Sequence, residues 1–421
     1  MYMEPMVINF GNTAFMLLCS ALVFLMTPAL GFFYGGLGRR KNMANNLFAS
    51  YFILGVGAVL WCAFGYTLTF SGGEGGVIGN FDKIFLEGIQ GELWAGDIPE
   101  GVWAAFQMTF AIITPALITG AVAGRMKFKS LVLFIVLWLF AVYFPLAHMV
   151  WGGGLMGLGD GNLGSIDFAG GNVVHISSGI TALVLCILLG KRKGYEKHSY
   201  RIHNVPFVAL GAGLLWFGWY GFNAGSAGAA DGLAAHAFLT TSIAAGMALL
   251  SWMLMDIFVS GKPTLVGAST GLVVGLVAIT PGAGFVPIWA SFIIGALVSP
   301  ICFFFVSIVK KKFKYDDALD VFGCHGVGGI WGGIATGLFC KDSVSGWGYG
   351  DGLLVGGGAD QFLKQLASIG ITIVWAVVGA LVCYTIVRMF GRIRVSERDE
   401  AIGLDMSQHG EEAYPSFNGL D

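Results

Sequence analysis

The feature that most constrains this chain is a series of apolar stretches, each long enough to cross a lipid bilayer as a helix. A membrane-spanning helix needs about 20 predominantly apolar residues. Eleven such stretches lie at about 12–33, 45–71, 102–124, 130–150, 168–190, 204–225, 233–259, 264–281, 284–309, 321–340 and 364–390. Only 11% of the 421 residues are charged, whereas a soluble domain carries about 25%. We therefore predict an all-α polytopic membrane protein with eleven transmembrane helices.

Basic residues gather on one side of the predicted helix bundle. Clusters of Lys and Arg follow the first, third, fifth, ninth and eleventh stretches, at 39–41, 125–129, 191–201, 310–314 and 388–398. The connection at 72–101, on the other side, is acidic. Because basic loops stay in the cytoplasm, we expect a cell-membrane protein with its N-terminus outside and its C-terminus inside. With a net charge of -2, nothing indicates binding to nucleic acid.

Two histidines lie inside stretches that are otherwise apolar and glycine-rich, His175 and His325. An ionisable side chain in hydrocarbon is costly unless it lines a cavity or finds a partner. At about 1.5 Å per residue, His175 would lie roughly 12 Å beyond Asp167, and His325 roughly 7–8 Å beyond Asp320 from the opposite face. The two histidines would thus meet near the middle of the membrane. They would line a polar path and share one proton, or simply bridge two helices.

The opposite directions of these two stretches indicate an inverted repeat. Residues 12–190 and 204–340 would be two halves of five helices each, and a site near the midplane is typical of such transporters. The final helix, at 364–390, lies outside the repeat. We therefore predict a membrane domain over 1–391 and a cytoplasmic regulatory tail over 392–421. The seven cysteines lack metal-ligand spacing, and no nucleophile motif is present, so we expect no metal, no cofactor and no enzymatic activity.

Six short segments together resemble one protein family. They read FYGGL at 33–37, AHMVWGGG at 147–154, DFAGG at 167–171, GWYGFNAGS at 218–226, DVFGCHG at 320–326, and GLD with SQHG at 403–410. In combination they resemble the ammonium transporter family (Amt/MEP/Rh), on its Amt branch. The resemblance implies an inverted five-plus-five repeat plus a final helix, a homotrimer with one pore per subunit, and a tail docked against a neighbouring subunit. It also implies a PII-type signalling protein as a partner at the cytoplasmic face.

The resemblance further assigns roles to residues near the outer helix ends. Phe110, Trp151 and Ser226 would recruit ammonium, since an aromatic face attracts a cation by about 0.5–2 kcal/mol. Phe110 and Phe222 would stack as a hydrophobic gate. For isolated residues, an aromatic belt at the membrane surface or ordinary core packing explains such positions as well. The flanking motifs favour the site.

Acidic residues precede both histidine-bearing stretches, and two interpretations of Asp167 are open. It suits the N-cap of a helix, and as a buried carboxylate it would also favour a cation in the vestibule. The resemblance implies that Asp167 is essential for transport. We expect Asp320 to cap its own helix. Gln107, about one turn before Phe110, and Trp219 are further candidates for supporting the vestibule.

The predicted function is the import of ammonium, with methylammonium as an analogue. Ammonium and potassium have similar size and charge, so size alone cannot separate them. A path that removes a proton can, because potassium has no neutral form. We expect ammonium to be recruited, deprotonated near Asp167 and the gate, and passed as ammonia along the histidines. Two options are open for the proton: transfer by a separate path, or no transfer across the membrane. The alternatives are an Rh-type channel for neutral ammonia or carbon dioxide, and an ammonium sensor that acts through a partner.

Overall fold

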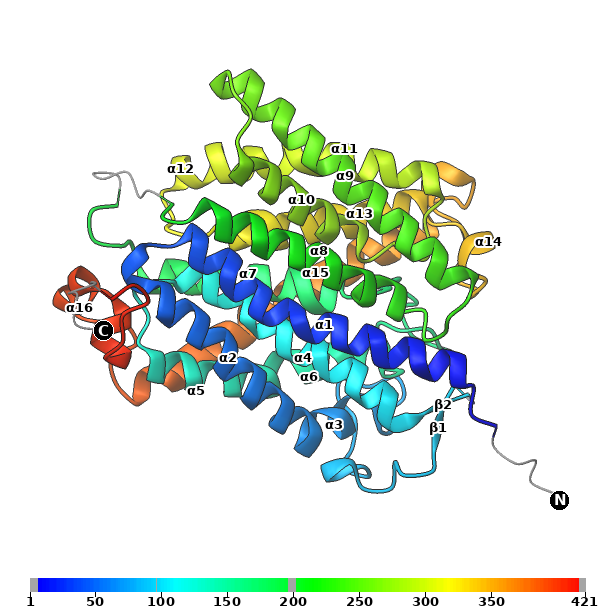
Figure 1. Cartoon of the computed structure of the whole chain (residues 1–421). Helices are drawn as coiled ribbons and strands as arrows, with labels where there is room; N and C mark the ends of the chain where they lie inside the picture. The colour runs from blue at the N-terminus through cyan, green and yellow to red at the C-terminus, as the bar shows by residue number, and fades with distance from the viewer. Residues whose placement is uncertain (1–6, 96, 196–201, 416–421) are drawn as a thin grey trace.

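The computed structural model describes residues 7–95, 97–195 and 202–415 and consists mainly of long helices that lie side by side (Figure 1). Within these residues, nine helical stretches are long and apolar enough to cross a membrane. They are Phe10–Leu37, Arg40–Phe70, Glu100–Val122, Phe128–Trp151, Gly171–Leu189, Val205–Gly225, Gly232–Ser260, Ile288–Phe313 and Asp360–Met389. Two shorter apolar segments, 265–279 and 322–339, overlap the remaining two predicted stretches. The predicted helical class is confirmed, and the helix count is consistent with the prediction.

Several of these stretches are divided by π-helical turns. The labelled helices are α1 (Phe10–Leu37), α2 (Met43–Leu60), α3 (Tyr66–Phe70), α4 (Glu100–Val122), α5 (Phe128–Trp138), α6 (Phe144–Trp151), α7 (Ser177–Leu189), α8 (Val205–Gly225), α9 (Gly232–Ser260), α10 (Leu265–Ile279), α11 (Ile288–Phe304), α12 (Lys310–Phe313), α13 (Val327–Phe339), α14 (Asp342–Ser345), α15 (Asp360–Met389) and α16 (Glu397–Ile402). The π-helical turns are η2 (Trp61–Gly65), η4 (Leu139–Tyr143), η5 (Gly171–Ile176), η6 (Phe305–Val309), η7 (Phe322–Gly326) and η9 (Asp405–His409). One two-stranded antiparallel ribbon pairs β1 (Leu93–Trp94) with β2 (Ile98–Pro99).

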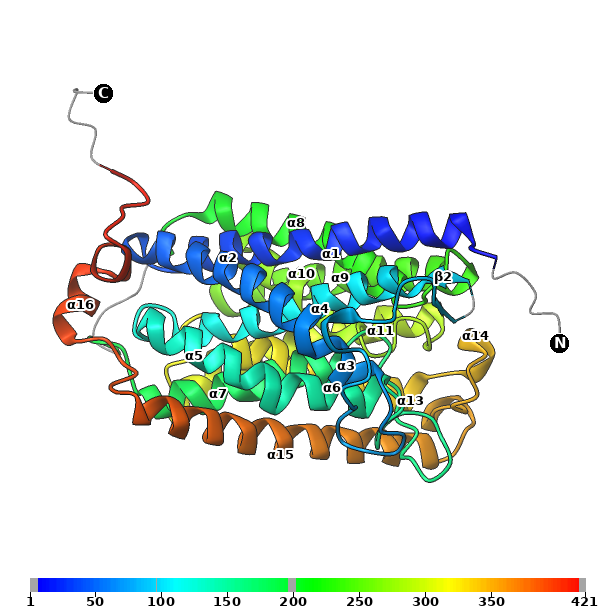
Figure 2. The same cartoon turned by 90° about the horizontal axis from the view of Figure 1, so that it is seen from below.

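The bundle has two distinct ends. The start of α1, the β1–β2 ribbon and α14 lie at one end, and α12 and α16 lie at the other (Figure 1). We call these the ribbon end and the α16 end. In the second view, α15 runs along the side of the bundle opposite α1 and α8 (Figure 2). Part of the predicted basic loop, residues 196–201 with Lys197 and Arg201, lies outside the described residues.

Glycine allows the helices to approach closely where side chains would keep them apart. A Cβ placed on Gly221 of α8 would lie 2.7 Å from the carbonyl oxygen of Cys19 in α1. A Cβ on Gly179 of α7 would overlap the backbone of Gly326 at the end of η7. Such contacts are typical of packed membrane helices. The second one brings the two histidine-bearing segments together.

The two histidine-bearing segments enter the bundle from opposite ends. η5 follows Asp167, which borders a cavity at the ribbon end, whereas η7 follows the α12 connection at the α16 end. The expectation that Asp320 caps its helix was wrong. Asp320 has a left-handed φ of 60° and forms an ion pair with Lys310 at 2.5 Å. Asp317 instead accepts a hydrogen bond from the Phe322 N–H at 2.7 Å, because the loop places it one turn before η7.

Candidate functional site

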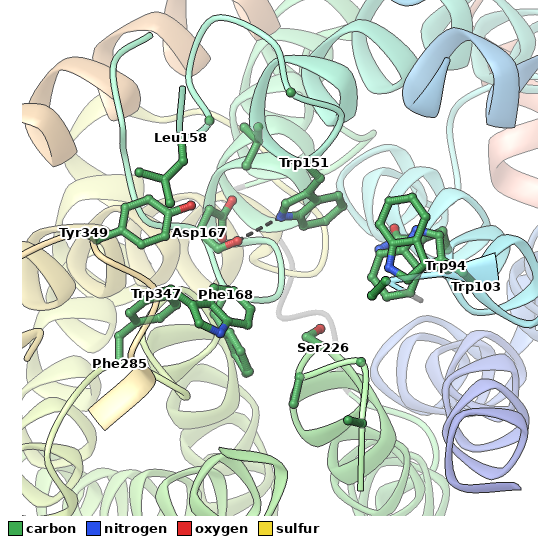
Figure 3. Close-up of a pocket in the computed structure, with 18 of the residues that line it drawn as sticks. Trp94, Trp103, Trp151, Leu158, Asp167, Phe168, Ser226, Phe285, Trp347 and Tyr349 are labelled. Carbon is green, nitrogen blue, oxygen red and sulfur yellow. Dashed lines mark hydrogen bonds between the residues drawn. The ribbon is translucent and has the colours of Figure 1, made fainter. Parts of the chain in front are cut away.

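An aromatic cavity of about 520 Å³ opens at the ribbon end of the bundle. Five segments contribute to it: the β1–α4 region, the end of α6 with the loop after it, the end of α8, the connection between α10 and α11, and the connection after α14. Figure 3 shows their side chains facing a common space. Its lining residues include Trp94, Trp103, Gln107, Phe110, Trp151, Asp167, Phe168, Ser226, Phe285, Trp347 and Tyr349. The cavity therefore brings together five of the predicted site residues.

Asp167 organises one wall of this cavity. Its buried carboxylate accepts hydrogen bonds from four successive backbone N–H groups, those of residues 170 to 173, at distances of 2.5 to 3.2 Å. Its backbone carbonyl accepts a bond from the Trp151 indole N–H at 2.8 Å (Figure 3). Both interpretations of Asp167 are thus compatible with the geometry. The side chain caps η5 and places a negative charge beside the cavity, and the main chain orients Trp151.

Ser226 and Trp151 offer two kinds of contact to a cation. The Ser226 hydroxyl donates to the Phe222 carbonyl at 2.8 Å, which leaves its oxygen as an acceptor. Trp151 meets Phe110 edge to face, with ring centroids 5.8 Å apart. An acceptor oxygen together with an indole ring suits a small cation that can donate hydrogen bonds.

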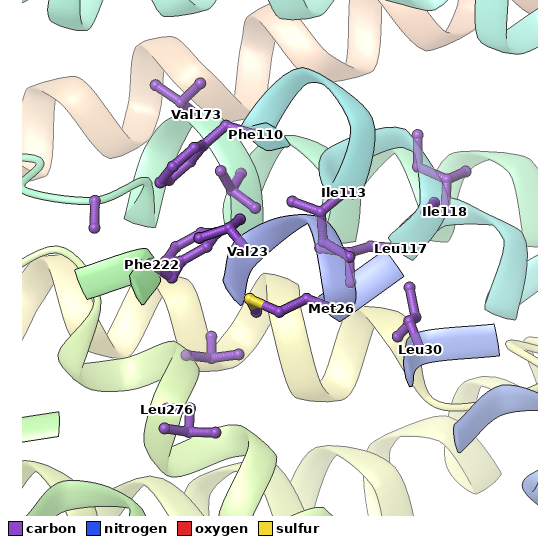
Figure 4. Packing of buried hydrophobic residues seen from close by; sticks show 14 of the residues in the cluster. Val23, Met26, Leu30, Phe110, Ile113, Leu117, Ile118, Val173, Phe222 and Leu276 are labelled. Carbon is purple, nitrogen blue, oxygen red and sulfur yellow. The ribbon is translucent and has the colours of Figure 1, made fainter. Parts of the chain in front are cut away.

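Two phenylalanines close the inner end of the cavity. The rings of Phe110 and Phe222 stack with centroids 4.3 Å apart and an interplanar angle of 29°. Each is 1% exposed. Figure 4 shows the pair at one end of an apolar lining that continues past Ile113 and Leu117. Hydrated ions are disfavoured at such a constriction, because it offers nothing to replace the water they would lose.

Beyond the phenylalanines, the two histidines meet in a narrow enclosed space. The Nδ1 atoms of His175 and His325 are 3.3 Å apart, and the rings stack with centroids 5.3 Å apart. In a hydrogen bond between two ring nitrogens, one donates and the other accepts, so the pair shares one proton. The space beside them has a volume of about 10 Å³ and is lined mostly by apolar side chains such as Met26 and Leu30. That volume admits about one water-sized molecule.

The sequence misplaced one candidate and missed several others. Trp219 does not border the aromatic cavity. It lines the histidine space, stacks on His175 at 5.4 Å between centroids, and donates to the Thr280 hydroxyl at 2.9 Å. Gln107 lies in the cavity as expected, and its buried Oε1 has no hydrogen-bond partner among the described residues.

The missed residues are aromatic side chains from the first turn of α4 and from connections between helices. Trp94 and Trp103 stack at 4.6 Å on one wall, and Trp347 meets Phe168 at 5.8 Å on another. Their aromatic character is visible in the sequence, but their convergence is not, since more than 200 positions separate Trp103 from Trp347. No group of three or more His, Cys, Asp or Glu side chains in the described ranges could hold a metal ion.

The α16 end contains a buried cluster of charged side chains. Arg192 donates to the buried carboxylate of Asp316 at 2.6 Å, and Arg125 lies 3.4 Å from the same group. Burial alone would raise the pKa of Asp316, but the hydrogen bonds and charges of the two arginines outweigh it and lower that pKa. The start of the tail docks here on its own subunit, where Asp405 accepts from the Asn45 N–H at 2.8 Å. These contacts order the tail at least as far as η9.

This fold and its cavity define a class of protein: a multi-pass membrane transporter with an aromatic cavity at one end and a histidine pair in its interior. Comparison with known protein families then identifies the family. The sequence model of the Ammonium Transporter Family matches residues 14–414, and the chain belongs to that family. The predicted resemblance is therefore confirmed.

Similar proteins cover nearly the whole chain. It is 47% identical to the ammonium transporter of Bacillus subtilis over 407 residues, which is 96% of this chain and 98% of that protein. It is 40% identical to ammonium transporter Amt1 of Archaeoglobus fulgidus over 404 residues, 96% of this chain and 99% of that one. Among solved structures, Candida albicans Mep2 superposes with a TM-score of 0.86 at 34% identity, covering 97% of this chain and 91% of its own. A protein described as a sensor Amt protein also gives a TM-score of 0.86, at 26% identity, covering 95% of this chain and 98% of its own.

Proposed function

We propose that this chain transports ammonium into the cell. The observation that carries the proposal is the order of elements along one path: an aromatic cavity, a stacked phenylalanine pair and a histidine pair in a narrow apolar space. Relatives at 40–47% identity are named ammonium transporters, which supports the same cargo here. The proposed role is transport, without a catalysed change to the bound molecule.

Recruitment takes place in the aromatic cavity, which acts as an outer vestibule. Ammonium rests on the faces of Trp151 and Phe110 and donates to the oxygen of Ser226. Asp167 contributes negative potential. Its carboxylate is engaged by four backbone N–H groups, so it acts by stabilising the cation and by orienting the wall and not as a freely placed base. Gln107 supports the vestibule from α4, and Trp219 supports the histidines.

Selectivity follows from deprotonation before the phenylalanine gate. Ammonium gives its proton to a water molecule of the cavity beside Asp167 and passes Phe110 and Phe222 as ammonia, which needs no hydration shell. Potassium cannot take this path, because it has no neutral form. His175 and His325 then accept hydrogen bonds from ammonia and relay the proton separately, since an imidazole pair can exchange one proton without both rings becoming charged.

The arrangement of the whole protein forms a second part of the proposal. Counted along the chain, the odd-numbered membrane spans end in the cytoplasm, so the ribbon end faces outward and the α16 end inward, in the cell membrane. Residues 1–391 form the membrane domain, with pseudo-repeats over 12–190 and 204–340, and 392–421 form the regulatory tail. Three copies assemble as a homotrimer, and a PII-type protein binds the cytoplasmic face.

One alternative function is an Rh-type channel for neutral ammonia or carbon dioxide. The indole of Trp151 and the oxygen of Ser226 favour a cation at the entrance, which a neutral gas does not need. The other alternative is a sensor, which finds support in the likeness to the sensor Amt protein. The relatives named as transporters are more similar to this chain in sequence.

The test is ammonium-evoked charge movement in proteoliposomes on a solid-supported membrane. We expect a current in the wild type with ammonium and methylammonium and none with potassium. An uptake signal without any charge movement would favour the neutral-gas channel instead.

Replacing both histidines, His175 and His325, by Asp tests the proposed proton relay. We expect potassium current to appear, because two carboxylates in the narrow space beyond the gate would stabilise a cation that has lost its water. If potassium still fails to pass, the histidines are not the selectivity element.

A further inference from the structure

A second cavity, unrelated to the transport path, lies at the α16 end of the bundle. It has a volume of about 760 Å³ and is formed by the ends of α7 and α15, the start of α5 and the chain at 391–396. Lys127, Arg388, Arg392 and Arg394 line it, together with the single carboxylate of Asp399. Cations therefore dominate its wall.

Several of the basic side chains in this wall form no ion pair within the protein. Arg394 is committed, because it donates to the Leu189 carbonyl at 2.9 Å and pairs with Glu400 at 2.9 Å. Asp399 is also committed, since its carboxylate accepts from the Ser396 hydroxyl at 2.8 Å in a capping box. Across the described ranges, the side chains of Arg388, Arg392 and Lys127 have no ion-pair partner. They leave a wall with a net positive charge.

The same cavity has an apolar side at the depth where a membrane-spanning helix ends. α15 is one of the apolar helices long enough to cross a membrane, and Arg388 lies in its last turn. Met389 and Phe390, which follow, are 79% and 74% exposed. Leu188 at the end of α7 is exposed and borders the cavity with Tyr384. Exposed apolar side chains next to arginines are typical of a membrane–water interface, not of a surface in water.

We propose that this cavity binds the phosphate headgroup of an anionic phospholipid of the inner leaflet. The guanidinium groups of Arg388 and Arg392 contact the phosphate, since arginine matches its oxygens in a bidentate fashion. Lys127 adds charge from α5, and the acyl chains lie against Leu188 and Tyr384. Basic pockets between transmembrane helices on the cytoplasmic side commonly take such headgroups.

The position of the site gives the lipid a structural consequence. Segment 391–396 joins α15 to the tail, and the Lys127 N–H donates to the Ile393 carbonyl at 2.9 Å. A lipid held between Arg388, Arg392 and Lys127 would therefore fasten the start of the tail to the membrane domain. This inference does not rest on the proposed transport activity, because its test measures lipid binding.

Native mass spectrometry of the full-length protein, titrated with phosphatidylglycerol or phosphatidylcholine, measures the affinity of each bound lipid. We expect the tightest site to prefer phosphatidylglycerol by at least about tenfold, since each nearby cation contributes a factor of about five. Arg388→Gln with Arg392→Gln should abolish that preference, and Arg388→Lys with Arg392→Lys should retain most of it. The matched control is Lys311→Gln with Lys312→Gln, which removes two exposed cations of the same face outside the cavity.

Three results would overturn the proposal. The first is equal affinity of the wild type for the two lipids. The second is an equal loss of preference in the control, which would indicate general surface charge. The third concerns a soluble anion: if glycerol phosphate raises the melting temperature as much as phosphatidylglycerol at the same concentration, the site takes free phosphate esters instead of lipid. The lysine variants show whether a loss in the glutamine variants reflects charge or misfolding.

Discussion

The segments before the two histidines are built alike at the backbone and differ in their surroundings. Asp167 precedes His175 by eight positions, and Asp317 precedes His325 by eight. In each segment, one carboxylate oxygen accepts a hydrogen bond from the backbone N–H five residues later. Asp167 accepts from Asn172 at 2.8 Å, and Asp317 accepts from Phe322 at 2.7 Å. The two segments therefore share one device, a carboxylate that fixes the start of a π-helical turn and so the depth of a histidine.

The difference lies in what each carboxylate faces. Asp167 borders an open aromatic cavity and accepts four backbone N–H bonds. Asp317 is buried next to the ion pair of Lys310 and Asp320. Its Oδ1 has no hydrogen-bond partner among the described residues. The shared device positions the histidines. Under the proposed function, the surroundings of each carboxylate decide which end attracts a cation. Three substitutions test this division.

The largest effect is expected at Asp167. Asp167→Ala leaves four buried N–H groups without their acceptor, each at a cost of about 1–3 kcal/mol, so the wall that carries Trp151 should rearrange. We expect methylammonium uptake in proteoliposomes to fall by at least about a hundredfold. A free-energy loss of about 3 kcal/mol corresponds to a factor of that size. Asp320→Asn is the matched control, since Asp320 pairs only with a side chain, and it should keep uptake within about threefold. Equal uptake by Asp167→Ala and the wild type would remove the role given to Asp167.

A moderate effect is expected at Trp151. Trp151→Leu removes the indole face and the bond to the Asp167 carbonyl while keeping an apolar side chain. We expect KM for ammonium-evoked current to rise about fivefold, as the loss of about 1 kcal/mol of cation–π attraction implies, with little change in the maximal current. The control is Trp289→Leu, an exposed tryptophan that does not line the cavity. A fall in maximal current at unchanged KM would contradict a recruiting role.

The smallest effect is expected at Asp317. Asp317→Asn keeps an oxygen that can accept from the Phe322 N–H but removes the charge. If this residue only fixes the depth of His325, uptake should stay within about threefold and stability within about 1 kcal/mol of the wild type. Uptake and thermal unfolding of the same preparation measure both. A loss of uptake as deep as that of Asp167→Ala would show that the two halves share a transport role, and the comparison would fail.

Much of the fold was predictable because a bilayer leaves few choices. Every backbone polar group inside hydrocarbon must be satisfied within its own helix, so apolar length alone predicts the spans. The ends of the predicted ranges differ from those of the observed helical stretches by at most about five residues, as for 45–71 against Arg40–Phe70. The family, too, was recognisable from short glycine and aromatic motifs, and the match over residues 14–414 confirms it.

The candidate site was predictable only in part. Phe110, Trp151, Asp167, Ser226 and Gln107 do line one cavity, and His175 does meet His325, although their roles in transport stay predictions. The cap of the second segment was assigned to Asp320, because both Asp317 and Asp320 precede η7 and only the loop conformation separates them. Trp219 was assigned to the wrong cavity, since one helical turn of α8 decides which side of Phe222 it faces.

The sequence by itself therefore determined the spans, their alternation across the membrane and the family, because each follows from local composition or a contiguous motif. The tertiary structure decided which carboxylate caps which turn, which distant aromatic residues share the cavity, and where the unpaired arginines gather beside α15. Those features depend on side chains from segments far apart in the chain, and their meeting is set by the close glycine contacts between helices, such as Gly179 against Gly326.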